Sequence, residues 1–213
     1  MISPKQLRIL GTWCTSPFGE HSFSQLRTLL NESSHASLQT ALRAFLDENL
    51  LIMRQIGPTK LYAINHQNAS THLYLQMAAA DRLSAHARAS IAMVKECLDS
   101  QGILYAGAVF GSYATGKQDK TSDIDLAVMV QDKVSKGKAK GAMGTAALRS
   151  PLRLDAQVMT RTELLNMLCA DEANLGKEIA RGNLPVFAAS LFYCTIIDAM
   201  RHGFSPLPLA GGK

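Results

Sequence analysis

The feature that most constrains this chain is a pair of apolar runs joined by a polar turn, with two aspartates where the second run begins. Residues 103–110 are apolar and end abruptly at Gly111. After the turn, the tetrapeptide Ser-Asp-Ile-Asp at 122–125 leads into a second apolar run at 126–130. Short apolar runs bounded by turn residues are typical of buried β-strands. The sequence therefore predicts two core strands with a polar connection between them.

The two aspartates and the turn predict a shared chemistry. Side chains two apart on a strand point to the same face, so Asp123 and Asp125 are expected to lie side by side. Ionised carboxylates at this spacing repel each other unless a cation lies between them. Their oxygens suit Mg²⁺ bound to substrate phosphates. Gly111 and Ser112 suit the phosphates, because glycine allows close backbone approach and a small hydroxyl or a helix N-terminus donates hydrogen bonds.

In this order, Gly111-Ser112 and the segment 122–126 resemble the signature of the DNA polymerase beta-like nucleotidyltransferase superfamily, and within it the small minimal nucleotidyltransferases. The resemblance covers roughly residues 103–187, near the ~100 residues usual for one domain. It implies a strand, Gly-Ser, a short helix, Asp-x-Asp on the next strand and a third carboxylate on a later strand. Asp155, within the alternating run 151–159, fits that last position.

The resemblance also implies an activity, the transfer of a nucleoside monophosphate from an NTP such as ATP to an acceptor hydroxyl with release of pyrophosphate. Asp123 and Asp125 would hold two Mg²⁺ ions, and Asp155 would complete the ion that activates the acceptor. Gly111 and Ser112 would hold the triphosphate. Candidate acceptors are a protein hydroxyl, a small molecule and a nucleic-acid end. The alternative is a DNA-binding transcriptional regulator whose nucleotidyltransferase fold only senses nucleotide.

One departure from the minimal group concerns the phosphate contacts. Members often carry an arginine soon after Gly-Ser, where this chain has Tyr113, Ala114 and Thr115.

The first 65 residues predict a different unit. Helical spacing of apolar residues covers 4–15, 22–30 and a third segment ending near 48, and two apolar runs flank the turn Gly57-Pro58. Three helices and a hairpin resemble a winged helix-turn-helix domain. On that interpretation the third helix and the wing contact DNA bases and phosphates. The DNA-binding candidates are His35, Gln39, Arg43, Arg54 and Lys60.

Charge leaves a second interpretation of this unit open. Residues 1–70 hold six Lys or Arg and four Asp or Glu, a modest excess for a DNA-binding domain. A winged helix that binds protein is therefore the alternative.

Residues 71–100 contain no Gly or Pro and predict one continuous helix of roughly 45 Å. Its apolar positions step by threes and fours, which suits either a coiled-coil homodimer or a connecting helix packed on both flanking units. The expected stripe is Leu73, Met77, Ala80, Leu83, Ala87, Ile91, Val94 and Leu98.

Positive charge gathers in residues 131–153. This segment holds six basic residues against the single acid Asp132, an excess equal to the whole chain's net charge of +5. It is interpreted either as a surface that attracts nucleotide or a polyanionic acceptor, or as a mobile glycine-rich loop that orders only with substrate. The basic residues are Lys133, Lys136, Lys138, Lys140, Arg149 and Arg153.

The remaining patterns complete an α+β prediction. Helices are expected at 161–170, 174–181 and 188–200, with a short edge strand at 185–187. A hydrophobic content of 47%, four scattered cysteines and no apolar run of bilayer length favour a cytoplasmic globular protein with reduced thiols. The expected boundaries are a winged helix-turn-helix at 1–68, a connecting helix at 69–102, a nucleotidyltransferase domain at 103–202 and a flexible tail at 203–213.

Overall fold

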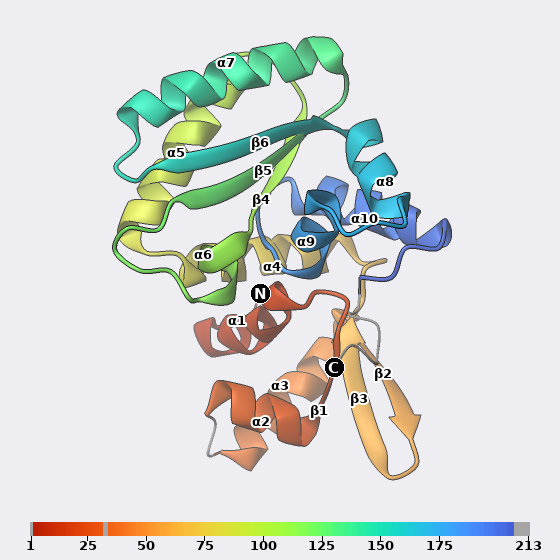
Figure 1. Cartoon of the computed structure of the whole chain (residues 1–213). Coiled ribbons are helices and arrows are strands. Elements are labelled where there is room, and N and C mark those ends of the chain that lie inside the picture. Colours follow the sequence, from red (N-terminus) through yellow and green to blue (C-terminus); the bar gives the residue numbers. More distant parts are fainter. Residues whose placement is uncertain (1, 32–33, 207–213) are drawn as a thin grey trace.

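A computed structural model describes residues 2–31 and 34–206, and it contains two small β-sheets flanked by helices (Figure 1). A three-stranded sheet belongs to the N-terminal part of the chain and a four-stranded sheet to the C-terminal part. This arrangement confirms the predicted α+β class with small sheets flanked by helices.

The N-terminal part has the predicted helices and hairpin. A capping box at Ser3 begins the first helix, in which the Ser3 hydroxyl accepts from the backbone N–H of Gln6. One strand was missed, because a three-residue polar segment gives no alternation signal. The elements are α1 (Pro4–Leu10), the 3₁₀ helix η1 (Gly11–Thr15), β1 (Glu20–Ser22), α2 (Phe23–Leu30), α3 (His35–Asp47), β2 (Leu51–Ile56) and β3 (Thr59–Ile64). The missed strand β1 pairs with β3, so the antiparallel sheet has the order β1-β3-β2.

The predicted single helix over 71–100 is wrong. The segment forms two helices, α4 (Ala69–Arg82) and α5 (Ala85–Asp99). Leu83 is buried in an extended conformation with φ −83° and ψ 141°. Ser84 begins α5 as its N-cap, and its hydroxyl accepts a hydrogen bond of 3.2 Å from the backbone N–H of Ala87. A serine cap and a buried leucine end the first helix without any Gly or Pro.

Because the chain is not helical at Leu83 and Ser84, the apolar positions of α4 and α5 no longer lie on one continuous face. The expected apolar stripe is buried only in α5. Leu73 and Met77 on α4 are 58% and 47% exposed, whereas Ile91 and Val94 on α5 are buried. Instead, α4 turns Leu75 and its neighbouring alanines toward the core. The predicted coiled-coil homodimer depended on one continuous helix, which the structure does not provide.

The C-terminal sheet has the order β6-β5-β4-β7, and its strand β5 is covered on both faces, since every residue of β5 except Asp125 is buried. Strands β5 and β6 are parallel and joined by a crossover helix, and the other two pairs are antiparallel. The predicted edge strand is confirmed as β7. The elements are β4 (Tyr105–Val109), α6 (Gly111–Thr115), β5 (Ile124–Val130), α7 (Lys133–Arg149), β6 (Leu154–Thr160), α8 (Arg161–Cys169), α9 (Leu175–Arg181), β7 (Leu184–Phe187) and α10 (Ala189–Arg201).

The basic glycine-rich segment is ordered as the 17-residue helix α7, so its prediction as a mobile loop is wrong. Asp132 is the N-cap and accepts from the backbone N–H of Ser135 at 2.7 Å. Lys136 ties the helix to α8 through Glu163 at 2.6 Å. Four small or flexible apolar residues form its buried face, namely Ala139, Ala142, Met143 and Ala146. Tertiary contacts therefore outweigh the helix cost of glycine, about 1 kcal/mol each.

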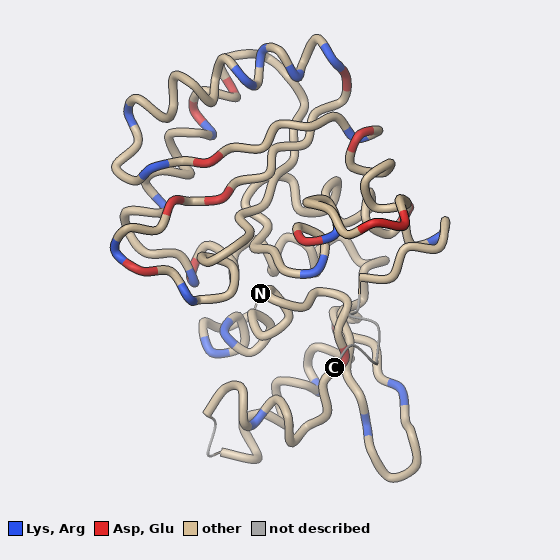
Figure 2. The backbone as a smooth tube through the Cα atoms, viewed as in Figure 1, with Lys and Arg blue, Asp and Glu red and all other residues tan. Residues whose placement is uncertain are grey.

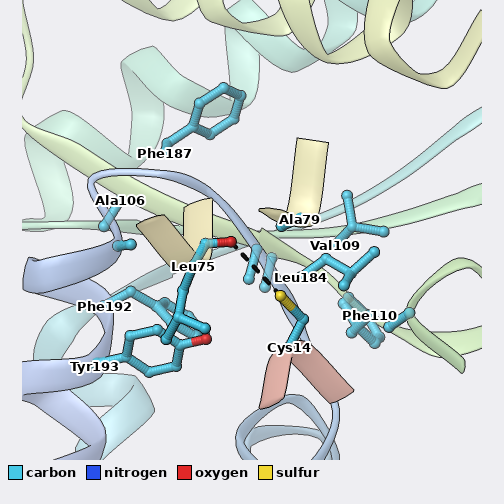
Figure 3. Packing of buried hydrophobic residues seen from close by; sticks show 14 of the residues in the cluster. Cys14, Leu75, Ala79, Ala106, Val109, Phe110, Leu184, Phe187, Phe192 and Tyr193 are labelled. Carbon is cyan, nitrogen blue, oxygen red and sulfur yellow. Dashed lines mark hydrogen bonds between the residues drawn. The ribbon is translucent and has the colours of Figure 1, made fainter. Parts of the chain in front are cut away.

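The two parts of the chain share one hydrophobic core. Cys14 of η1 is buried beside β4 and β7, and its thiol lies 3.6 Å from the backbone oxygen of Leu75 on α4 (Figure 3). Burial raises the pKa of the Cys14 thiol to about 12. The same 3₁₀ helix also contacts α6 and β7. The N-terminal part is thus anchored directly on the C-terminal sheet.

A chain of hydrogen bonds reinforces this junction. A carbonyl only accepts, so His66 donates from Nε2 to the Pro17 oxygen at 2.9 Å. Neutral His66 then accepts at Nδ1 from Nε2 of His72 at 3.1 Å, and His72 accepts at Nδ1 from the Ser190 hydroxyl at 3.2 Å. Burial lowers the pKa of His66 to about 4, with a smaller contribution from His72. Burial also lowers the pKa of His72. Both rings are therefore neutral at pH 7.

Three further expectations concern membrane-spanning helices, the cysteines and the C-terminal tail. Within residues 2–31 and 34–206, no helix is long and apolar enough to cross a bilayer. Cys14 and Cys97 are buried, Cys169 and Cys194 are exposed, and all four are free thiols. The predicted tail at 203–213 lies mostly outside the described residues, although Phe204 and Pro206 near its start are buried.

The free energy of unfolding should fall as the pH drops from 6.5 to about 4, the ordinary and the folded pKa of His66. In this range the unfolded chain binds a proton at His66 and the folded chain does not, so full stability is present above the unfolded pKa. The shift corresponds to about 3 kcal/mol. Urea unfolding at pH 7.5, 5.5 and 4.5 checks this. His66→Gln removes the titrating ring, so an equally steep pH dependence in the variant would contradict the assignment.

Alanine at Gly141 should stabilise the protein by about 0.5–1 kcal/mol, because helix propensity improves and the space is open. A Cβ on Gly141 would meet nothing within 4 Å. Gly176→Ala is the contrasting variant and should be destabilised, because its Cβ would lie 2.7 Å from Cβ of Met167. Thermal unfolding of the two variants should move in opposite directions, and a loss of stability in Gly141→Ala would show that this face of α7 is not free.

Candidate nucleotide and metal site

The fold brings the three predicted aspartates to one end of the C-terminal sheet. Acidic segments lie beside each other where β5 and β6 begin (Figure 2). Asp125 and Asp155 are direct partners in the parallel register of these strands, and Asp123 immediately precedes β5. Asp123 and Asp125 are half-buried and Asp155 is exposed. Ile124 between the first two is fully buried, as the strand alternation predicts.

Asp125 has a raised pKa in this environment. Burial raises its pKa first, and the negative charges of Asp155, Glu178 and Asp123 raise it further. A hydrogen bond from the backbone N–H of Ser112 acts in the opposite direction. The site therefore concentrates negative charge that a cation would relieve.

Glu178 on α9 is a fourth carboxylate that sequence reasoning did not assign to the site. Its charge acts on Asp125 more strongly than that of Asp123. The sequence carried no signal for this role, because Glu178 lies far from Asp125 along the chain and only the fold brings its charge close enough to act on that aspartate.

Gly111 allows Asp125 to approach the start of α6. The residue has φ +65°, and a Cβ built on it would lie 2.1 Å from Oδ2 of Asp125. Only glycine fits this contact without displacing the carboxylate. Gly116 ends the same helix with φ +71° but has open space around it. Gly111 and Ser112 thus border Asp125 through their backbone.

Asp123 has an unusual environment. Its Oδ1 is buried and receives no hydrogen bond within the described structure. The nearest positive charge is Nε of Arg153 at 3.4 Å, on a side chain that is 85% exposed. A buried carboxylate oxygen without a hydrogen bond, next to a second carboxylate with a raised pKa, suits the binding of a hard cation.

The carboxylates do not form a closed cage. Across residues 2–31 and 34–206, no group of three or more His, Cys, Asp or Glu side chains is arranged to hold a metal ion. Asp155 instead accepts a hydrogen bond of 2.9 Å from Nε2 of Gln157. Mg²⁺ commonly takes only one or two protein carboxylates and fills its other positions with water and substrate phosphates. Asp123 and Asp125 fit that kind of site, with Asp155 at its margin.

The DNA-binding candidates are at the surface of the N-terminal part. His35, Gln39 and Arg43 are exposed along α3, and the His35 ring lies 4.5 Å from the Phe23 ring. Arg54 on β2 donates through Nε to Glu20 at 2.6 Å, and its guanidinium makes a second contact with the same carboxylate. Lys60 on β3 is exposed. Arg54 therefore has its charge largely offset by Glu20.

Alanine at Gly111 should cost more stability than alanine at Gly116. Both positions have positive φ, so each variant loses about 1–2 kcal/mol from backbone strain. Only Gly111→Ala also forces its Cβ against Asp125, at a built distance of 2.1 Å. Urea unfolding of both variants measures the difference, and equal losses would show that Asp125 moves freely away from α6.

Comparison with known proteins agrees with the location of this site. Residues 93–184 match the family model described as Polymerase beta, Nucleotidyltransferase. The matched segment includes β4, α6, β5 and β6, and with them the Gly-Ser pair and all three aspartates. No curated protein and no solved structure matches the chain. The C-terminal part of the chain is therefore similar to nucleotidyltransferase domains of this family.

Proposed function

We propose that the C-terminal part is an Mg²⁺-dependent nucleotidyltransferase. It would move a nucleoside monophosphate from an NTP to an acceptor hydroxyl and release pyrophosphate. The observation that carries this proposal is the convergence of Asp123, Asp125 and Asp155 beside Gly111 and Ser112 within the segment that matches the family model. NMP transfer is the activity that a domain of this type suggests.

Asp123 and Asp125 are proposed as the metal ligands, and Asp155 as the additional ligand nearest the acceptor. The support is the orphaned Oδ1 of Asp123 and the raised pKa of Asp125. When bound, two Mg²⁺ ions would lower the pKa of the acceptor hydroxyl and neutralise charge on the attacking and leaving oxygens. Asp155 is exposed, so an incoming acceptor has access to it.

Gly111 and Ser112 are proposed to position the triphosphate. Gly111 lacks the side chain that would separate the backbone from Asp125, so a phosphate held by the metal ligands also meets this turn. The Ser112 N–H holds Asp125, which orients the carboxylate toward the same space. Holding the phosphates in one geometry supplies the orientation that phosphoryl transfer mainly requires.

We further propose that the N-terminal part is a winged helix-turn-helix that binds DNA. Its α3 would be the recognition helix, with His35, Gln39 and Arg43 toward the bases. Arg54 and Lys60 on the β2–β3 hairpin would contact phosphates, although Arg54 must first exchange Glu20 for DNA. The order of three helices and a hairpin supports this proposal.

Replacing Asp125 by Asn should abolish Mg²⁺-dependent NTP binding and reduce pyrophosphate release by at least about 100-fold. The fold should persist, because the raised pKa of Asp125 means that its charge is unfavourable in the folded state. Calorimetry with ATP, GTP, CTP and UTP, each with and without Mg²⁺, measures the binding.

Asp132→Asn is the matched control, because Asn also caps a helix and Asp132 follows the opposite end of β5. It should bind nucleotide like the wild type. Retained turnover in Asp125→Asn would overturn the catalytic assignment.

A second function is favoured by the contact between the two parts. Because η1 is buried on the C-terminal sheet and contacts α6, a change at the Gly-Ser turn is transmitted to the N-terminal helices without a flexible linker. The protein would then be a DNA-binding regulator whose nucleotidyltransferase fold only senses nucleotide. DNA affinity that depends on nucleotide, without pyrophosphate release for any acceptor, distinguishes this function from the first.

A further inference from the structure

Arg153 is the basic residue closest to the proposed metal ligands. It lies just before β6, and its backbone oxygen accepts a hydrogen bond of 2.9 Å from the Ile124 N–H. This bond fixes the backbone of Arg153 against the start of β5. Of the basic side chains in the described ranges, it is the one whose ion pair reaches any of the three aspartates, with Nε 3.4 Å from Oδ1 of Asp123.

The ion pair between Arg153 and Asp123 is longer than two other ion pairs in the same part of the chain. The Asp123 oxygen that faces Arg153 is buried and receives no hydrogen bond, and the arginine side chain is 85% exposed. By contrast, Lys136 and Glu163 approach to 2.6 Å, and Arg161 and Asp198 to 2.7 Å. Exposed pairs without hydrogen-bond geometry contribute little to stability. The guanidinium is therefore easily displaced from Asp123.

We propose that Arg153 binds a phosphate oxygen of the NTP and stays beside Asp123 only until a divalent cation binds there. This inference rests on the proposed function. A cation on Asp123 would repel the guanidinium, and the triphosphate that enters with the cation is the anion within its reach. The planar guanidinium binds phosphate through two parallel N–H groups, which an ammonium does not.

The position of the charge supports this role. The Gly-Ser helix α6 has the sequence Gly-Ser-Tyr-Ala-Thr and carries no basic residue. A positively charged side chain for the phosphates would then come from outside α6. The Arg153 backbone is held at the start of β5 while its exposed side chain is able to turn from Asp123 toward solvent and substrate.

A purely structural role predicts a different outcome. If Arg153 only offsets repulsion between Asp123 and Asp125, its loss would lower the free energy of unfolding. The affinity for nucleotide would then change only because the affinity for Mg²⁺ changes. If Arg153 binds phosphate, its loss should change metal and nucleotide affinity in opposite directions.

The test is calorimetry on the full chain with two probes, Mg²⁺ alone and then the α,β-methylene analogues of the four NTPs at saturating Mg²⁺. Arg153→Gln should bind Mg²⁺ alone about fivefold more tightly, because a competing charge 3.4 Å from Oδ1 of Asp123 is removed. It should bind the preferred analogue about tenfold more weakly, because a charge-assisted phosphate contact is lost. Arg153→Lys should bind Mg²⁺ like the wild type and the analogue with intermediate affinity.

Arg161→Gln is the matched control, since Arg161 follows the other end of β6 and pairs with a surface aspartate. The affinities of Arg161→Gln for Mg²⁺ and for the analogue should equal those of the wild type. If the wild type binds the analogue and Arg153→Gln binds it equally well, the proposed role of Arg153 is wrong, while the proposed function stands. Failure of the wild type to bind either Mg²⁺ or any analogue would instead refute the proposed function, and the role of Arg153 with it.

Discussion

Repulsion between carboxylates at the start of β5 and β6 is the constraint on which the C-terminal part depends. The sheet holds Asp125 opposite Asp155, with Asp123 two residues away and the charge of Glu178 added from α9. This arrangement is unfavourable by itself, as the raised pKa of Asp125 records. It persists because the rest of β5 is buried between layers of helices and leaves the strand no other register. The energy of the core thus maintains the proposed cation site.

The same core connects the site to the N-terminal part. The 3₁₀ helix η1 is buried on the sheet and contacts α6. Hydrogen bonds donated from Ser190 to His72, from His72 to His66 and from His66 to the Pro17 oxygen also join the two parts. Buried hydrogen bonds of this kind fix one geometry, because a partner lost from them would leave a desolvated polar group. The proposed DNA-binding surface and the proposed nucleotide site are therefore connected through one hydrophobic core, which suits coupling between them.

Sequence patterns predicted most elements but failed where local preference and tertiary contact disagree. The uninterrupted apolar spacing of residues 71–100 favoured one helix, yet burial of Leu83 and capping by Ser84 ended it. Glycines at 137, 141 and 144 favoured a loop, yet α7 forms because its alanine face packs on the sheet as the crossover between parallel strands. In both segments the deciding energy came from residues distant in sequence, which a local pattern does not contain.

Local patterns were enough to predict the strands around Gly111, the burial of Ile124 between Asp123 and Asp125, and the chemistry proposed for two carboxylates beside a Gly-Ser turn. These follow from the two-residue period of a strand and from residue identity, both of which are local. The tertiary structure alone decided that Asp155 faces Asp125, that Glu178 contributes to the same field, and that Arg153 lies beside Asp123. Those relations depend on strand order and register, and register is set by burial of whole faces in the folded chain.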